Sequence, residues 1–365
     1  MANIFLRSPF YFYQNTNPVG ALSIKLEIEI DTVLRYTLIK NTSADALFEV
    51  SELIRDYLDI YYNNEKSQNV FVRLIWNWYN GLNGTGTSLS SGTVTHFGID
   101  AYGYFEDGSN PTTTRGYMQS NDVIYRLADA DIRIQVDRNN TTSVTYLYEG
   151  QITKSFIVTP SASFVFTDIS DSEEPYDSFK DRITTDGGTY EDNVCISEFL
   201  DENETFPVDE IHIATTDGLR IVKVITIDEC KFTPVKLSFI NKWGALQDLW
   251  FFKKSIETLN ASKEQYKRAV IDVKGSYDPL VHPKKTYNVK SSKKITINTG
   301  YVSEQYNEPM QELIQSEQVW MEIDSVVTPM TVDANSLTFK TSVNDKLVDY
   351  TIDLSYAYNA INDIR

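Results

Sequence analysis

Hydrophobic and polar residues alternate along much of the chain with the period of two that is typical of β-strands. The clearest stretch is 21–30, where every second residue from Leu22 to Ile30 is Leu or Ile. Such a strand buries one face and leaves the other in water. A partner strand is predicted over 33–39 and a long strand over 70–79. Further strands are predicted over 93–105, 132–136, 143–148, 151–158, 163–167, 210–213, 219–227, 234–240, 248–253, 294–298, 319–323, 336–341 and 347–356.

Two segments carry the wider spacing that predicts a helix. In the first, helix 44–62, Leu47 and Val50 begin an apolar repeat at helical spacing, and Ser43 is a suitable N-cap. We expect this N-terminal amphipathic helix to pack on a sheet through its apolar face. The second segment, 308–318, predicts a short helix.

The aromatic content favours strands over helices, because 13% of the residues are aromatic, with 23 Tyr and 18 Phe. The close spacing of the strands is typical of sandwiches and barrels, and not of parallel sheets with crossover helices. The predicted fold class is therefore mainly β, with two β-sandwich or barrel-like domains. The acidic segment 168–207 is expected to be a linker or long loop between a domain over 1–167 and a domain over 208–365.

Charge disfavours two classes of partner. The chain has 51 acidic and 33 basic residues, for a formal net charge of −18, which argues against general nucleic-acid binding and against electrostatic attachment to a membrane. Two interpretations of the acidity stay open: it keeps the protein soluble, or it repels DNA that must pass without adhering. No secretory signal and no apolar run of bilayer length is recognisable, so we expect folding in a cytoplasm, with Cys195 and Cys230 as reduced thiols.

No motif arranges a catalytic acid, base or nucleophile. His96, His212 and His282 lie far apart and fit no metal-binding spacing. The glycine-rich loop 81–92 lacks the lysine and the following helix of a phosphate-binding loop, so we expect a flexible hairpin tip there. The carboxylates of 168–174 allow a calcium site, but a solvated acidic loop is the favoured interpretation. We therefore expect no enzymatic activity, no metal and no cofactor.

Clustered aromatic residues at the end of the strand predicted over 70–79 have two interpretations. Trp76 and Trp78 are two residues apart on a strand and so share a face, with Tyr79 beside them. This face could stack sugars, or it could belong to the core or to a subunit interface, which is the favoured interpretation.

The segment 234–252 is typical of a hairpin. Asn241 and Gly244 punctuate its turn, and Asp248 begins the return strand. It resembles a hairpin of tail-hub and ring-type proteins of tailed bacteriophages, notably the crAss-like and related phages of Bacteroidota. In those proteins a strand ends in Asn, a turn Gly follows, and an Asp with aromatics begins the next strand. The resemblance extends from about Pro207 to the C-terminus.

The resemblance implies a structural protein without catalytic residues. We expect a homo-oligomeric ring closed by head-to-tail contacts, in the tail or neck of a virion assembled in the host cytoplasm. Its expected partners are other tail or neck proteins of the virion. DNA is expected to pass through the central channel without specific binding, and no membrane is involved. Candidate interface residues are Trp76, Trp78, Tyr79, Asn241, Trp243, Gly244, Asp248, Trp250, Phe252 and Trp320.

Two other functions stay open at this stage. One is an adsorption or fibre protein of the virion that stacks host glycans on Trp76, Trp78 and Tyr79. The other is a carboxylate-dependent depolymerase, since a pair of acidic residues needs proximity only in space. It ranks last, because nothing in the sequence arranges an acid and a base.

Overall fold

The computed structural model is mainly β, as the sequence predicts, with 54% of the residues in strands and 8% in helices. It divides into two compact units, each assembled from separate parts of the chain. Unit 1 comprises 1–228, 238–249 and 308–316, and unit 2 comprises 229–237, 250–307 and 317–365. The residues that the structure describes are 3–15, 18–62, 69–113, 115–127, 130, 132–158, 166–170, 208–229, 231–333 and 347–360.

The first sheet of unit 1 is built from the long alternating strands. Its order is β1-β7-β6-β3-β4, and Ile24 of β3 lies opposite Trp78 of β6. The predicted hairpin of 21–39 is confirmed. The strands are β1 (Asn3–Phe5), β3 (Ser23–Ile30), β4 (Val33–Lys40), β6 (Asn69–Tyr79) and β7 (Ser88–Ile99).

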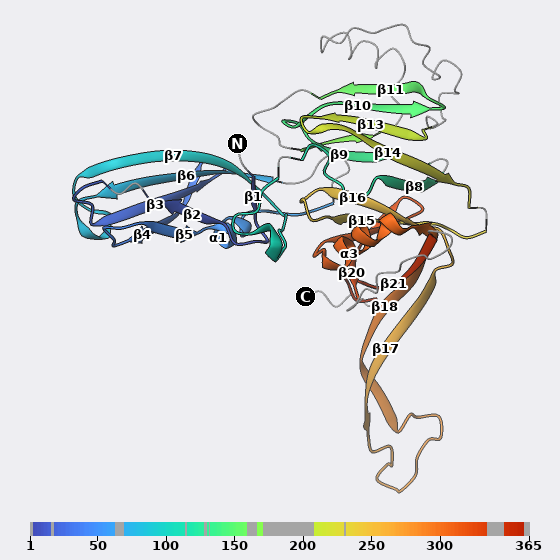
Figure 1. The fold of residues 1–365 in the computed structure, drawn as a ribbon. Helices are drawn as coiled ribbons and strands as arrows, with labels where there is room; N and C mark the ends of the chain where they lie inside the picture. The colour runs from blue at the N-terminus through green and yellow to red at the C-terminus, as the bar shows by residue number, and fades with distance from the viewer. Residues whose placement is uncertain are drawn as a thin grey trace. The chain divides into compact units, whose positions relative to one another are not determined.

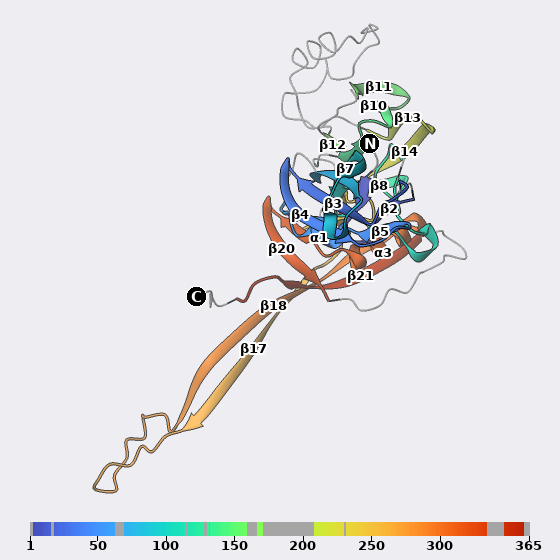
Figure 2. The same cartoon turned by 90° about the vertical axis from the view of Figure 1, so that its left-hand side faces the viewer.

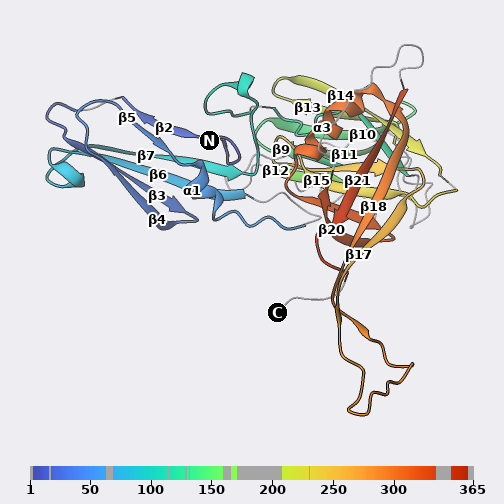
Figure 3. The same cartoon turned by 90° about the horizontal axis from the view of Figure 1, so that it is seen from below.

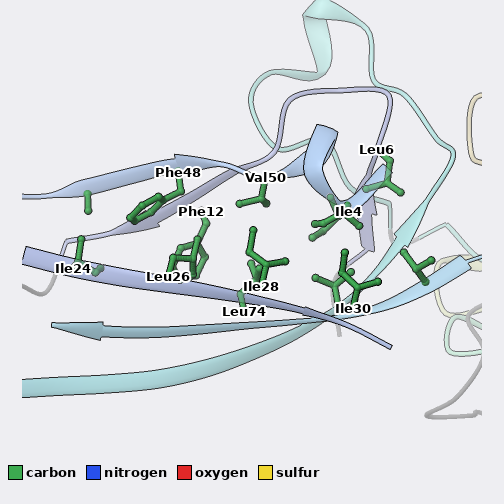
Figure 4. Packing of buried hydrophobic residues seen from close by; sticks show 14 of the residues in the cluster. Ile4, Leu6, Phe12, Ile24, Leu26, Ile28, Ile30, Phe48, Val50 and Leu74 are labelled. Atoms are coloured by element: carbon green, nitrogen blue, oxygen red, sulfur yellow. The ribbon is translucent and has the colours of Figure 1, made fainter. Parts of the chain in front are cut away.

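A second, two-stranded sheet covers the apolar face of the first. It pairs β2 (Tyr11–Gln14) with β5 (Ala46–Glu49). Figure 4 shows Phe12 and Phe48 from this small sheet pointing toward Leu26 of β3. The core of this part of unit 1 therefore lies between two β-layers.

The predicted helix 44–62 is wrong. Its first residues form β5, in which Ala46 and Phe48 are buried while Leu47 is exposed. Only α1 (Ser51–Arg55) is helical within that range. Strand pairing with β2 overrides the helical spacing of the apolar residues, because it buries Phe48 against the first sheet.

A further five-stranded sheet of unit 1 has the order β11-β10-β13-β14-β8. The predicted hairpin near Asp217 and Gly218 is confirmed, because β13 and β14 pair antiparallel there and Gly218 has a positive φ of 125°. β13 also pairs with β10, so the chain after the segment 171–207 returns to the same sheet. The strands are β8 (Val123–Leu127), β10 (Thr141–Tyr148), β11 (Gln151–Ile157), β13 (Glu210–Thr215) and β14 (Gly218–Ile227), and β9 (Arg133–Asp137) pairs separately with β12 (Phe166–Ser170).

The helix predicted over 308–318 is confirmed as α3 (Asn307–Gln315). It follows a 3₁₀ turn at Glu304–Tyr306. Met310 and Leu313 are buried on its apolar face. It is the longest helix in the described part of the chain, so the main helix is C-terminal and not N-terminal.

A seven-stranded sheet forms most of unit 2, in the order β16-β15-β19-β20-β21-β18-β17. The division between the units falls within β15 and β16. Seen from below, β20, β21 and β18 lie side by side (Figure 3). The strands are β15 (Val235–Ile240), β16 (Leu246–Phe251), β17 (Ile256–Lys267), β18 (Lys284–Ser303), β19 (Val319–Ile323), β20 (Val326–Val332) and β21 (Leu347–Tyr356). The strand predicted over 336–341 lies outside the described residues.

Candidate interaction surface

The most exposed part of the fold is the outer end of the β17–β18 ribbon. We call residues 262–290 the arm. β18 pairs with β21 only from Lys294 onward, and the last backbone hydrogen bond beside the ribbon joins Ala360 to Ser291. Beyond that point β17 and β18 have only each other as partners. Figures 1 and 2 show the arm standing clear of the other strands of unit 2.

No residue of β17 is buried, although the strand is twelve residues long. An ordinary sheet strand buries at least one face, so its side chains alternate between core and solvent. The arm instead exposes apolar side chains on its strands and at its tip, which is a sign of an interaction site when they gather on one element. The exposed apolar residues are Tyr266, Ile271, Val273, Tyr277, Leu280, Tyr287 and Val289.

Two aspartates organise the tip of the arm. The Asp272 carboxylate accepts hydrogen bonds from the backbone N–H groups of Lys274 (2.8 Å) and Ser276 (2.9 Å). Asp278 accepts one from Leu280 N–H at 2.9 Å. Such side-chain-to-backbone bonds hold tight turns without a core. The tip therefore presents its apolar side chains on a defined backbone.

The arm carries the opposite charge to the rest of the chain. It contains seven Lys or Arg and three Asp or Glu, for a net charge of +4, whereas the whole chain has −18. Lys263 and Lys267 on β17, and Lys284 and Lys285 on β18, form no ion pair with any described residue. Their charges are therefore available to an acidic partner.

Within the arm, hydrogen bonds stabilise one acidic residue. Asn288 Nδ2 donates to Glu264 Oε1 at 2.8 Å. Hydrogen bonds from Asn288 and Tyr287 lower the pKa of Glu264. The Glu264 carboxylate thus has a hydrogen-bond partner within the arm, while the nearby lysines are exposed.

The turn of the predicted 234–252 hairpin is a structural feature of unit 1. Asn241 is fully buried, and its Oδ1 accepts hydrogen bonds from Trp243 N–H (3.0 Å) and Ala245 N–H (3.1 Å). Its Nδ2 donates to the Met118 carbonyl at 2.7 Å. Gly244 has a φ of 75°, and an added Cβ would lie 3.3 Å from the backbone of Asp100. Asn241 and Gly244 therefore fix the turn against neighbouring backbone.

The two central residues of that turn are buried or half-buried and make cation–aromatic contacts. Lys242 Nζ lies 3.0 Å from Asp107 and 4.2 Å from the ring centre of Tyr104. The hydrogen bond with Lys242 lowers the pKa of Asp107. Trp243, which is half-buried, lies under the guanidinium of Arg115 at 5.5 Å.

The aromatic cluster of β6 does not form one exposed platform. Trp78 is fully buried in the core, and Trp76 packs against the same cluster. Trp76 fits there because its partner Gly92 has no side chain: a Cβ would lie 2.6 Å from the indole. Tyr79 projects to the other face, where Lys25 Nζ lies 5.8 Å from its ring.

The remaining predicted interface residues are mostly buried or paired. In unit 1, Ser238 Oγ donates to Asp248 Oδ1 at 2.5 Å. In unit 2, Trp250 stacks on Phe252 with ring centres 6.4 Å apart, and Phe252 is buried. Trp320 is also buried. Asp248 and Trp250 are the half-buried members of this set, and the ammonium of Lys236 lies 5.9 Å from the Trp250 ring.

A buried glutamate lies where α3 packs in unit 1. Glu312 is fully buried, and Ser120 Oγ donates to its Oε2 at 3.1 Å. Burial raises the pKa of Glu312 to about 7, with a contribution from the nearby Glu308. The same helix end is held by Tyr102, whose hydroxyl donates to Gln315 Oε1 at 2.8 Å.

The other predicted chemical groups do not converge. His212 Nε2 lies 3.1 Å from Glu210, and His96 packs edge-on against Phe10. Among the described residues, no group of His, Cys, Asp or Glu is arranged to hold a metal ion. The helices in that part of the chain are too short or too polar to span a bilayer. Cys195, Cys230 and the acidic side chains of 168–174 lie outside the described residues.

Sequence reasoning missed the arm. One signal was available: between 262 and 290 an acidic chain becomes basic. Comparison with protein-family models and with curated proteins finds no match for the chain.

Proposed function

We propose that this protein is a structural subunit that assembles with copies of itself through the arm, and that the assembly is a ring. The main support for this proposal is the exposed β-ribbon of the arm. Its apolar tip is not buried, and four of its lysines form no ion pair, within the described part of the chain. Apolar side chains gathered on an exposed element of this kind can gain burial only from another molecule. The ribbon is thus suited to assembly.

The partner that fits the arm is a second copy of the same chain. The arm has a net charge of +4, so the other residues together carry −22. Opposite charges on two patches of one protein steer copies into head-to-tail contacts. Head-to-tail contacts use different patches on the two copies and close into a ring when the rotation per subunit allows it.

The setting proposed for this ring is the tail or neck of a tailed-phage virion, where it surrounds the DNA channel. Support comes from the resemblance of the 234–252 hairpin and the C-terminal half to tail-hub and ring-type proteins. The acidic surplus outside the arm supports a lumen from which DNA is repelled. Other tail or neck proteins would be its neighbours. The two β-layers around Phe12 and Phe48 support a sandwich architecture for the N-terminal part.

A shortened arm tests the proposal. Ser262 and Lys290 are paired residues, so 263–289 can be replaced by Asn-Gly, which closes a two-residue hairpin at that point. We expect the natural chain to form a closed oligomer, visible as rings by electron microscopy and as a multiple of the chain mass by light scattering. The shortened chain should be a folded monomer with an unchanged circular dichroism signal in the β region.

A charge-conserving variant is the matched control. Replacing Lys263, Lys267, Lys284 and Lys285 by Arg keeps the net charge, so assembly should persist. Rings of the shortened chain would overturn the role of the arm, and a monomeric natural chain at low salt would overturn the proposed assembly. A monomer that instead binds host glycans on an array would favour an adsorption protein.

A further inference from the structure

A pocket of 490 Å³ opens in unit 1. It is lined by Thr112, Thr113 and Arg115–Tyr117, by Thr215 and Asp217–Arg220 of the β13–β14 hairpin, and by Trp243. The segment around Gly116 can pack closely against Thr141 and Thr215 because Gly116 has no side chain. A Cβ at Gly116 would lie 2.7 Å from Thr215 and 2.7 Å from Thr141. The pocket is therefore built from closely packed backbone.

Two guanidinium groups face this pocket. Arg220 pairs with Asp122 at 2.7 Å. Arg115 forms no ion pair among the described residues: its Nη2 donates to the Gln119 carbonyl at 2.8 Å. Burial, and then the positive charge of Arg220, lower the pKa of Arg115. The two cations thus repel each other, and an anion placed between them would relieve that repulsion.

Two aromatic rings line the pocket beside Arg115. Arg115 lies 5.5 Å from the ring centre of Trp243 and 5.7 Å from that of Tyr117, which fixes its planar group. The Nε1 atom of Trp243 is buried and has no hydrogen-bond partner among the described residues. The pocket therefore places the planar guanidinium of Arg115 beside the indole ring of Trp243.

We propose that this pocket binds a carboxylate or phosphate group joined to a flat apolar ring. A guanidinium fork matches the paired oxygens of either anion, and the indole covers the ring. The ligand is a free small molecule or an acidic, aromatic end of another chain. Either kind of ligand presents the same two groups, an anion and a flat apolar ring. This site is independent of the proposed assembly through the arm.

Calorimetric titration tests the site with benzoate and phenyl phosphate as probes, and with inorganic phosphate and benzyl alcohol as partial probes. We expect saturable 1:1 binding of at least one complete probe and weaker binding of both partial probes. Arg115→Lys keeps the charge but loses the fork, and Arg220→Gln removes one cation. Each should weaken binding about tenfold or more, the usual worth of a charge-assisted hydrogen bond.

Arg35→Gln is the matched control, because Arg35, on β4 of the first sheet, also lies over a tyrosine ring, that of Tyr57, at 4.8 Å. It should leave the affinity unchanged. A thermal melt of each variant separates lost binding from lost folding. Equal affinities in all variants, or no saturable binding of either complete probe, would overturn the site. Preference for phenyl phosphate indicates a phosphate ester, and preference for benzoate indicates a carboxylate such as a chain end.

Discussion

Two antiparallel ribbons of this protein have similar backbone pairing and opposite surroundings. In unit 1, β3 pairs with β6, and every second residue of β3 is buried, among them Ile24, Leu26 and Ile28. In unit 2, β17 pairs with β18 over most of its length, and none of its residues is buried. The backbone hydrogen bonds within the two pairs are alike, although β3 and β6 each have a further partner strand, β4 and β7. The first ribbon stabilises the fold by burial, and the second leaves its side chains exposed.

The largest expected difference between the two ribbons is the loss of stability when a cavity is made in the buried one. Trp78→Ala removes a fully buried indole, and we expect a loss of about 3–5 kcal/mol in the free energy of unfolding of unit 1. Urea unfolding followed by circular dichroism measures it. Tyr277→Ala at the exposed tip is the counterpart and should leave the unfolding curve in place. Equal losses in both variants would contradict the division of roles.

A buried and an exposed glutamate should affect the pH dependence of stability in different ways. Glu312 is buried with its pKa raised to about 7 from an ordinary 4.5, so the folded state holds its proton longer than the unfolded state. Stability should therefore fall as pH rises from about 4.5 to 7, by at most about 3 kcal/mol, and then level off. Glu312→Gln should remove this decline and be the more stable form at pH 8.

Glu264 in the arm is the control for that experiment. It is exposed, and hydrogen bonds lower its pKa instead of raising it. Glu264→Gln should therefore keep the decline of stability between pH 4.5 and 7. Urea midpoints at several pH values measure both variants, and an unchanged decline in Glu312→Gln would rule out Glu312 as its cause.

Two turns give a smaller effect. Asn241 and Asp272 both accept two backbone N–H groups, but Asn241 is buried and Asp272 is exposed. Asn241→Ala should cost about 2 kcal/mol or more, because water cannot replace its bonds. Asp272→Ala should cost much less, because water reaches the tip. Chemical denaturation of both variants measures the difference, and a larger cost for Asp272→Ala would reverse the comparison.

The smallest expected change in stability comes from Val273, which is fully exposed at the tip. Val273→Ser should change the unfolding free energy by no more than about 0.5 kcal/mol. It should nevertheless weaken assembly, because it removes apolar surface that only a partner can bury. Sedimentation velocity over a concentration series measures the association. Tighter association of the variant would exclude the tip from the contact.

The sequence predicts the buried ribbon because burial imposes a period of two on residues such as Leu26 and Ile28. The arm has no buried face, so nothing imposes that period on it. β17 was therefore missed, and β18 was predicted over 294–298 alone. A fully exposed strand carries no alternation of apolar and polar residues from which it could be predicted.

The wrong helix over 44–62 has a different cause. Leu47, Val50 and Ile54 are spaced like a helical face, yet Val50 and Ile54 reach the core from the end of a strand and one short turn of helix. The pairing of β5 with β2 joins residues far apart in the chain. Local spacing cannot anticipate such a partner.

The candidate interface residues were identified by type and not by burial. The turn residues Asn241 and Gly244 were recognised correctly as punctuation, but the partner of the Asn241 amide, Met118, lies 123 residues away. Trp78 was placed on the same face as Trp76, and both do pack on one cluster. That this face is core follows from its covering strands, β2 and β5. The prediction of a single linker at 168–207 falls mostly on residues outside the described part of the chain.

The most direct test of arm-mediated assembly is to ask which copy the arm touches. Natural chains labelled with ¹⁴N and with ¹⁵N are mixed, allowed to exchange, and treated with a carbodiimide that joins amines to carboxylates within contact distance. Mass spectrometry then identifies the linked peptides. Docking of the arm on a second copy predicts links from Lys267 or Lys284 to acidic residues outside the arm, in peptides of mixed label. Links confined to peptides of one label, or no links from the arm at all, would contradict it.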